Sequence, residues 1–177
     1  MENLHLIPLV GADEETFIRE LQTAFQAAVT EEFGPEAGEA IPRRAVEESL
    51  RAKKAEAFRV VEDGEVIGGV VVQIDLETRR NSLDLLYINP GCHSRGTGLK
   101  VWRLIEAKYP ETEVWETHTP YFEKRNIHFY VNKCGFHIVE FFNPHHRSAH
   151  DTEEENPPGG EYFFRFEKRM KPAAFSE

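Results

Sequence analysis

The sequence predicts a single α/β domain with a mixed, mostly antiparallel central sheet flanked by helices. Segments with strand-like and helix-like hydrophobic spacing interleave in the order β-α-α-β-β-β-α-β-α-β-β. The 177 residues are enough for one well-packed core and few for two. We therefore assign residues 1–170 to one domain and residues 171–177 to a C-terminal tail that we expect to fray.

The N-terminal part predicts one strand and two helices. Leu4 to Val10 has the alternation of a strand, and apolar residues from Phe17 to Ala28 recur every three or four positions, as in an amphipathic helix. Residues 32–42 hold two glycines and two prolines, which exclude a regular element. A second helix is predicted from Arg43 to Lys54.

A β-hairpin follows. Phe58 to Val61 and Val66 to Ile74 are strand-like and are joined by Asp63-Gly64, a favoured two-residue hairpin turn. Gly68-Gly69 inside the second strand indicates a bulge or a close backbone approach.

The chain is organised around a strand, a glycine-rich turn and a helix. Leu83 to Ile88 is a short apolar run, Asn89-Pro90-Gly91 ends it, and Leu99 to Tyr109 has helical spacing. Two glycines in His93-Ser94-Arg95-Gly96-Thr97-Gly98 let the backbone approach a ligand closely. The next helix directs its N–H groups and positive dipole end at this turn, which predicts a phosphate or pyrophosphate site.

Two common phosphate motifs do not fit this turn. A Walker P-loop requires lysine where Thr97 stands, and a dinucleotide fingerprint requires glycine where Val101 stands. What remains is a turn that binds phosphate through backbone amides, with a charge-assisted contact available from Arg95.

The C-terminal part predicts three strands and a helix. Strands are expected at Glu113 to His118 and Phe136 to Phe142, with a helix from Glu123 to Lys133 between them. The polar, histidine-bearing segment from Asn143 to Gly160 reads as a surface loop, and Tyr162 to Phe166 is expected to close the sheet.

The composition excludes several classes of protein. A net charge of −10 argues against general binding of nucleic acid or of anionic membranes. Cys92 and Cys134 are too few for a disulfide framework, and no apolar run reaches membrane-spanning length. The N-terminus lacks the basic and apolar regions of a signal peptide, so a cytoplasmic location is expected.

Two segments resemble a known family. Leu86-Tyr87-Ile88-Asn89-Pro90, followed by the turn 93–98, resembles motif A of the GNAT superfamily of N-acetyltransferases. Asn126-Ile127-His128-Phe129-Tyr130, with Cys134-Gly135-Phe136, is similar to that family's Asn…Tyr…Gly-Phe segment. The order of elements fits from about Leu4 to Met170. His93 stands where the family usually has Arg or Gln, and Tyr130 lies five residues before Gly135 instead of the common four.

The resemblance implies a fold and an activity. The strands at 83–88 and 114–117 would splay apart, with the acyl-CoA arm in the gap. Acetyl-CoA would be the cosubstrate, without a metal, and an acetyl group would pass directly to a primary amine of a small molecule or peptide in a ternary complex. A homodimer is common in the family. The implied cofactor-binding residues are Leu86, Ile88, His93, Ser94, Arg95, Gly96, Thr97, Gly98 and Asn126.

Acyl transfer needs a proton acceptor for the amine and a proton donor for the leaving thiolate. The resemblance makes Tyr130 the candidate donor, and the alternative is an aromatic residue that packs its helix onto the sheet. Glu116 and His118 share one face of their strand, and either could act as the base, directly or through water. We take Glu116 as the candidate; solvated side chains are the alternative.

Three other possibilities remain. Cys134 as a nucleophile is disfavoured by its place in the Gly-Phe turn and by the family's direct transfer. His145, His146, His150 and Asp151 have no fixed metal-ligand spacing and favour a solvated loop. A non-catalytic acyl-CoA-binding regulatory module would share the turn at Arg95 to Gly98 and differ at the acceptor end.

Overall fold

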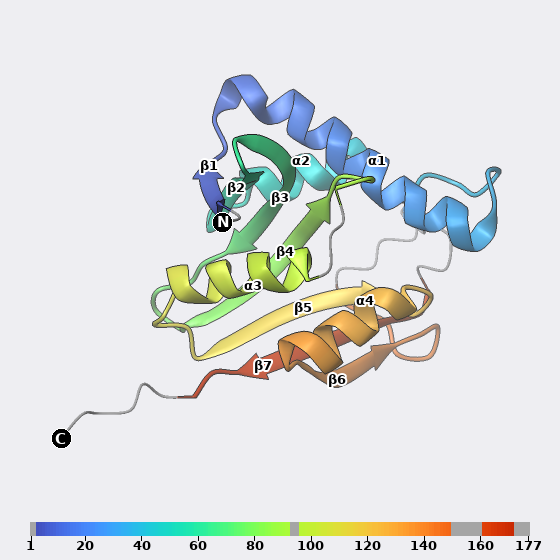
Figure 1. Cartoon of the computed structure of the whole chain (residues 1–177). Coiled ribbons are helices and arrows are strands. Elements are labelled where there is room, and N and C mark those ends of the chain that lie inside the picture. Colours follow the sequence, from blue (N-terminus) through green and yellow to red (C-terminus); the bar gives the residue numbers. More distant parts are fainter. Residues whose placement is uncertain (1–2, 93–95, 150–160, 172–177) are drawn as a thin grey trace.

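The computed structural model describes residues 3–92, 96–149 and 161–171. Its elements follow the predicted order along the chain (Figure 1). The helices and strands are β1 (Leu4–Pro8), a 3-10 turn (Gly11–Asp13), α1 (Glu14–Phe33), α2 (Arg43–Arg51), β2 (Ala55–Glu62), β3 (Glu65–Gln73), β4 (Arg80–Ile88), α3 (Thr97–Lys108), β5 (Val114–Pro120), α4 (Lys124–His128), a π-helix (Phe129–Cys134), β6 (His137–Phe142) and β7 (Phe163–Arg169).

Seven strands form one sheet in the order β1-β2-β3-β4-β5-β7-β6. Among the strands of the described residues, only β4 and β5 pair in parallel, and every other neighbouring pair is antiparallel. Helices α3 and α4 cover one face, and α1 and α2 cover the other (Figure 1). The expectation that the last strand closes the sheet is wrong: β7 inserts between β5 and β6, so β6 forms the edge of the sheet opposite β1.

Several boundaries also differ from the sequence prediction; the second helix, for example, ends at Arg51 instead of Lys54. The first strand ends at Pro8 instead of Val10, and β5 continues through Thr119 to Pro120 instead of ending before them. The helix expected from Glu123 to Lys133 is divided into α4 and the π-helix. Of the predicted tail 171–177, the structure describes Lys171 alone.

A β-bulge in β4 sets the geometry of the centre. Leu83 pairs with Val72 of β3 and Leu85 pairs with Val71, so Asp84 is an extra residue without a partner on β3. The bulge reverses the alternation of side chains. Leu83 therefore packs into the cluster beneath α3, whereas Leu85 and Tyr87 pack beneath α1.

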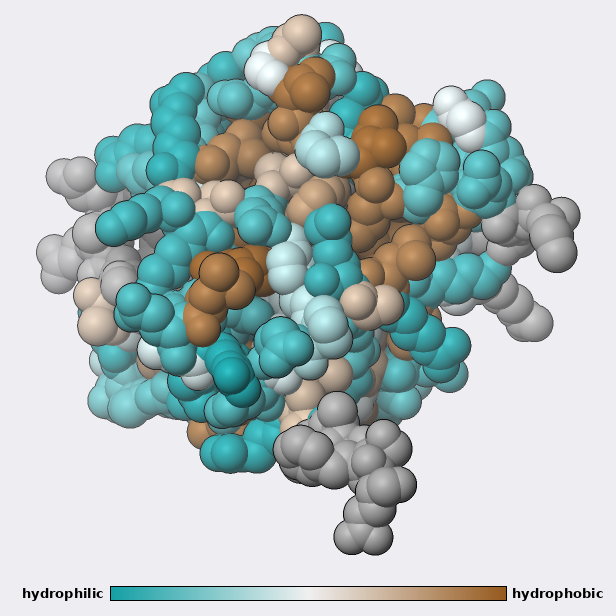
Figure 2. All heavy atoms as spheres, turned by 90° about the vertical axis from the view of Figure 1, so that its left-hand side faces the viewer, coloured by the Kyte–Doolittle hydropathy of each residue, from teal (hydrophilic) through white to brown (hydrophobic). Residues whose placement is uncertain are grey.

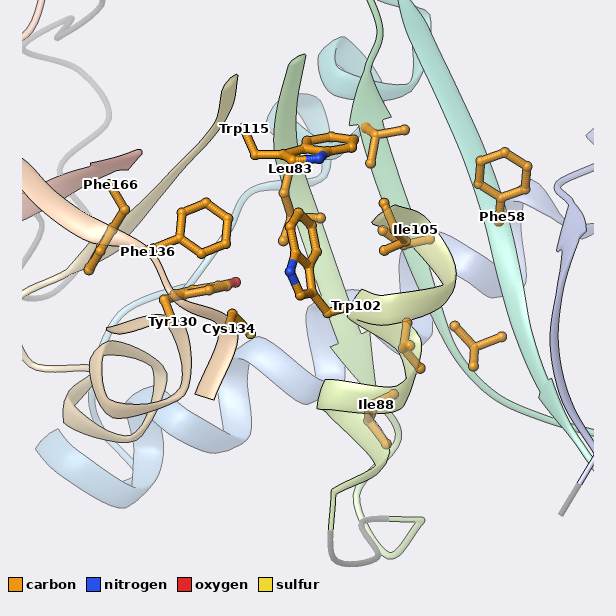
Figure 3. Packing of buried hydrophobic residues seen from close by; sticks show 14 of the residues in the cluster. Phe58, Leu83, Ile88, Trp102, Ile105, Trp115, Tyr130, Cys134, Phe136 and Phe166 are labelled. Atoms are coloured by element: carbon orange, nitrogen blue, oxygen red, sulfur yellow. The ribbon is translucent and has the colours of Figure 1, made fainter. Parts of the chain in front are cut away.

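The larger core cluster joins α3 to the sheet. Trp102 of α3 and Trp115 of β5 are fully buried and meet edge to face, with ring centroids 5.2 Å apart. Phe136 packs against Trp102 at the same centroid distance of 5.2 Å. Figure 3 shows these rings together with Tyr130 and Phe166 between the helices and the strands. This packing fixes the start of α3 relative to β5.

The predicted close approach at Gly68-Gly69 is confirmed. A Cβ atom on Gly68 would lie 2.2 Å from the backbone oxygen of Tyr87, and one on Gly69 would lie 2.3 Å from Phe17 Cε2. Glycine is therefore needed at Gly68 for the close approach of β3 to β4, and at Gly69 for the close approach of β3 to Phe17 of α1.

We expect Gly68→Ala to lower the free energy of unfolding by about 3 kcal/mol, because backbone has to shift to admit the methyl group. Gly11→Ala is the matched control: its Cβ would meet nothing within 4 Å, and we expect a change of at most about 0.5 kcal/mol. Urea denaturation measures both. Equal stability of the two variants would contradict the close approach.

The surface turned to the viewer in Figure 2 is mostly hydrophilic, with hydrophobic side chains gathered near its upper centre. Within the described residues, no helix has the length and apolar character needed to cross a membrane.

Candidate active site

The site begins where β4 and β5 part. Their pairing runs from Arg80 opposite Val114 to Leu83 opposite Thr117 and stops there. The Thr117 hydroxyl donates a 2.9 Å hydrogen bond to the Leu83 carbonyl oxygen and so closes the paired segment. Beyond it the two strands diverge (Figure 1), immediately after the bulge at Asp84. The predicted splaying of these strands is therefore present.

A cavity of about 1090 Å³ occupies this divergence. Its wall is built from the C-terminal half of α1, the linker to α2, the ends of β4 and β5, and α4. Lining residues include Ala28, Ile41, Asp84, Leu86, Ile88, Gly91, His118, Thr119, Asn126 and Tyr130. The sequence-predicted residues Leu86, Ile88, Asn126 and Tyr130 thus meet at one cavity.

The backbone of β4 can bind a ligand in this cavity. The Asn89 N–H donates a 2.7 Å hydrogen bond to Ile67 O of β3. Because backbone groups alternate in direction along a strand, those of Leu86 and Ile88 face the opposite way, toward the gap. They are therefore available to a ligand that adds to the sheet as an extended arm.

The glycine-rich turn lies at one end of the cavity. Gly96 has a left-handed φ of 81°, and α3 begins directly after it at Thr97. A Cβ on Gly98 would lie 3.3 Å from the Phe129 ring, a tight contact that would require a small shift of this ring. The positive end of the α3 dipole faces the turn. The predicted contacts from His93, Ser94 and Arg95 lie outside the described residues.

The π-helix places Tyr130. The backbone oxygen of Tyr130 accepts hydrogen bonds from the N–H groups of Gly135 and Phe136. A π-turn holds one residue more than an α-turn and is common at functional sites. It therefore accommodates the additional residue between Tyr130 and Gly135.

The Tyr130 side chain is buried and borders the cavity. Its ring packs against Phe136 and Phe166, and its hydroxyl points away from the helix, toward the centre of the sheet (Figure 3). Burial raises the pKa of this hydroxyl, and a hydrogen bond with Thr117 acts weakly in the opposite direction. The hydroxyl therefore keeps its proton at neutral pH.

The two candidate bases on β5 differ in position. His118 lines the cavity, whereas Glu116 is not among the lining residues. Glu116 Oε2 lies 3.3 Å from Arg165 Nη1 on β7, and its Oε1 lies 3.8 Å from His118 Nε2. Glu116 is thus placed behind His118 as seen from the cavity.

Asp84 is a cavity residue that the sequence analysis missed. Its carboxylate accepts hydrogen bonds from the side chains of Ser49, Gln73 and Ser82 at 3.0, 2.7 and 3.0 Å. In the sequence, Asp84 is an aspartate inside a hydrophobic strand. A solvent-facing aspartate on a strand at the edge of a sheet would give the same pattern. The bulge that directs it to the cavity depends on pairing with β3.

Other candidate groups have different surroundings. In the described ranges, no three His, Cys, Asp or Glu side chains gather as a metal site would require. His146 Nε2 lies 2.7 Å from Glu140 Oε2, and His150 and Asp151 fall outside those ranges. Burial raises the pKa of Cys134 to about 12, which disfavours a thiolate nucleophile there.

Known proteins match this arrangement. The family model "Acetyltransferase (GNAT) family" matches residues 18–136. Protein YrkN of Bacillus subtilis (strain 168) is 50% identical over 166 residues, which cover 90% of each chain.

Solved structures share the fold. Spermidine N-acetyltransferase from Vibrio cholerae, in complex with CoA and spermine, superposes with a TM-score of 0.66 at 16% identity, over 94% of this chain and 95% of that one. Ribosomal-protein-S18-alanine N-acetyltransferase from Escherichia coli gives 0.65 at 12% identity, over 100% and 99%. The family match spans most of the described fold and contains both β4 and the π-helix, and the chain therefore belongs to the GNAT family of acetyltransferases.

Proposed function

We propose that this protein transfers an acetyl group from acetyl-CoA to a primary amine of a small molecule or peptide, by direct attack in a ternary complex. The observation that carries the proposal is the continuous cavity between β4 and β5. It extends from Gly91, next to the glycine-rich turn, to the α1–α2 linker. One ligand can therefore enter from each end and meet the other between the strands.

The cosubstrate fits the β4 side of the cavity. The pyrophosphate would bind at the turn that ends in Gly96, Thr97 and Gly98, at the N-terminus of α3. The pantetheine arm would hydrogen-bond to the backbone of Leu86 and Ile88, with Asn126 of α4 on the facing wall. The Vibrio cholerae neighbour was solved with CoA bound.

The acceptor end of the cavity suits a cation. Along the whole cavity lining, carboxylates outnumber Lys and Arg side chains by five to two: Glu31, Glu32, Glu39, Asp84 and Glu123 against Lys124 and Arg125. Burial raises the pKa of Glu123; the neighbouring Glu31 and Glu32 act in the same direction, and Arg125 opposes them without reversing the shift. A bound ammonium group would relieve this repulsion and stabilise the ionised carboxylate.

The chemistry needs two proton transfers. The amine loses a proton and attacks the thioester carbonyl carbon, and Tyr130 donates its hydroxyl proton to the departing thiolate. The proton acceptor is a side chain of β5: Glu116, as the sequence analysis expects, or His118.

Thermal stability in the presence of acetyl-CoA, CoA, ATP and NAD tests the cosubstrate. A ligand that binds only the folded chain raises its melting temperature, so we expect a shift with acetyl-CoA and with CoA. Thiol release with spermidine, and with a peptide bearing an N-terminal alanine, then tests transfer. A shift with ATP or NAD alone would contradict the proposal. Acetyl-CoA binding without thiol release would favour the regulatory acyl-CoA-binding module.

The homodimer and the cytoplasmic location stay predictions. Gel filtration of the whole chain tests the first.

A further inference from the structure

Alternate side chains of β5 lie on opposite faces of the sheet, and both faces border the cavity. Thr117 and Thr119 are buried on the side of the sheet that carries Tyr130. Because side chains alternate along a strand, Glu116 and His118 lie on the other side, which α1 and α2 cover. Tyr130 and His118 both line the cavity. A thioester held between the splayed strands would therefore have Tyr130 on one side and His118 on the other.

His118 is both accessible and partly desolvated. Its ring lies beside the stacked rings of Phe142 and Phe163, with centroid distances of 6.3 and 6.2 Å, while 45% of its side chain remains exposed. This desolvation lowers the pKa of His118, and the Arg165 guanidinium acts in the same direction. The carboxylates Glu116, Asp84 and Glu140 oppose the shift without reversing it. The imidazole is therefore neutral at pH 7 and can accept a proton.

Glu116 is held in place behind this imidazole. Arg165 contacts Glu116 through Nη1 and is itself fixed by Glu140 at 2.9 Å and Glu167 at 2.7 Å. The Glu116 carboxylate is 3.8 Å from His118 Nε2, close enough to stabilise an imidazolium but too far for a hydrogen bond to the neutral ring. Its charge therefore favours His118 in the protonated state.

We propose that His118 is the group that takes the proton from the acceptor ammonium, directly or through one water, and that Glu116 is a positioning residue that stabilises the resulting imidazolium. The assignment rests on the proposed function. The deprotonated nitrogen forms the C–N bond, and the C–S bond breaks. Tyr130 protonates the thiolate and regains a proton from the attacking nitrogen, which is positively charged after the C–N bond forms. His118 releases its proton to solvent.

His118→Gln, with His137→Gln on exposed β6 as the matched control, tests the assignment. Thiol release is followed from pH 5.5 to 9 with spermidine and with the alanine peptide. In the wild type we expect kcat/KM to decrease as the pH is lowered through an apparent pKa, and we expect this pKa to be lower than 6.5. We call this decrease the acid limb of the pH profile. In His118→Gln we expect kcat at pH 7 to drop about 100-fold. Its rate should then rise with the fraction of unprotonated amine.

Glu116→Gln separates the two roles. Loss of the carboxylate removes a charge that favours the imidazolium, so the acid limb should move to lower pH while a measurable kcat remains. A structural role alone would change the rate without moving the limb.

The outcomes distinguish this assignment from the function on which it rests. Turnover by wild type with an unchanged rate and pH profile in His118→Gln would overturn the assignment alone. Absence of both turnover and an acetyl-CoA thermal shift in wild type would overturn the proposed function as well. The proposal would be supported if His118→Gln kept the wild-type thermal shift with acetyl-CoA while its kcat/KM no longer showed the acid limb.

Discussion

Replacing Tyr130 with phenylalanine is expected to lower kcat by about 100-fold or more, because this change removes the proposed proton donor for the leaving thiolate. The change removes only the hydroxyl, and the ring keeps its packing against Phe136 and Phe166. Burial raises the pKa of the Tyr130 hydroxyl, so the proton is present throughout the neutral range. KM for acetyl-CoA should stay within a few-fold of the wild-type value.

Steady-state thiol release measures this effect, and the acetyl-CoA thermal shift checks that binding is intact. Tyr162→Phe is the matched control, because Tyr162 is exposed and stacks on Phe141 away from the cavity lining. We expect the control to retain the wild-type kcat. A Tyr130→Phe variant with unchanged kcat would leave Tyr130 as a packing residue only.

The spacing of Tyr130 illustrates what sequence spacing can and cannot decide. Tyr130 lies five positions before Gly135, one more than is common in the family. In an α-helix the additional residue would rotate the Tyr130 side chain by about 100° around the helix axis. The π-helix at Phe129–Cys134 takes up that residue locally. Tyr130 therefore still reaches the cavity while Phe136 stays in the core.

Most of the fold follows from local sequence signals. The hairpin turn at Asp63-Gly64 has the left-handed angles, φ of 50° and 86°, that its residue types favour. The glycine turn and the start of α3 at Thr97 also agree with local propensity. These features depend on neighbouring residues, which a sequence displays directly.

The remaining features depend on pairing between distant segments. The bulge at Asp84 exists only relative to β3, and the insertion of β7 between β5 and β6 depends on which edge is already occupied. Both shape the site: the bulge directs Asp84 into the cavity, and β7 supplies the Arg165 that holds Glu116. Hydrophobic periodicity along the chain predicts neither the bulge at Asp84 nor the position of β7 in the strand order.

Trp102→Ala is expected to lower the free energy of unfolding by about 3–5 kcal/mol, which is the usual cost of deleting a fully buried aromatic side chain. Trp102 has no exposed surface and contacts both Trp115 and Phe136. Total stabilities of about 5–15 kcal/mol make this a large fraction of the whole. Urea denaturation at a constant m-value measures the loss.

Trp102→Phe separates ring packing from the indole N–H. The Nε1 atom of Trp102 is buried without a hydrogen-bond partner among the described residues, so the structure gains nothing from that donor. Phenylalanine keeps an aromatic ring against Trp115 and removes the unpaired donor. We expect it to lose less than half as much stability as alanine. Equal losses in the two variants would mean that this part of the core depends on the full shape of the indole, because a smaller aromatic ring could not replace it.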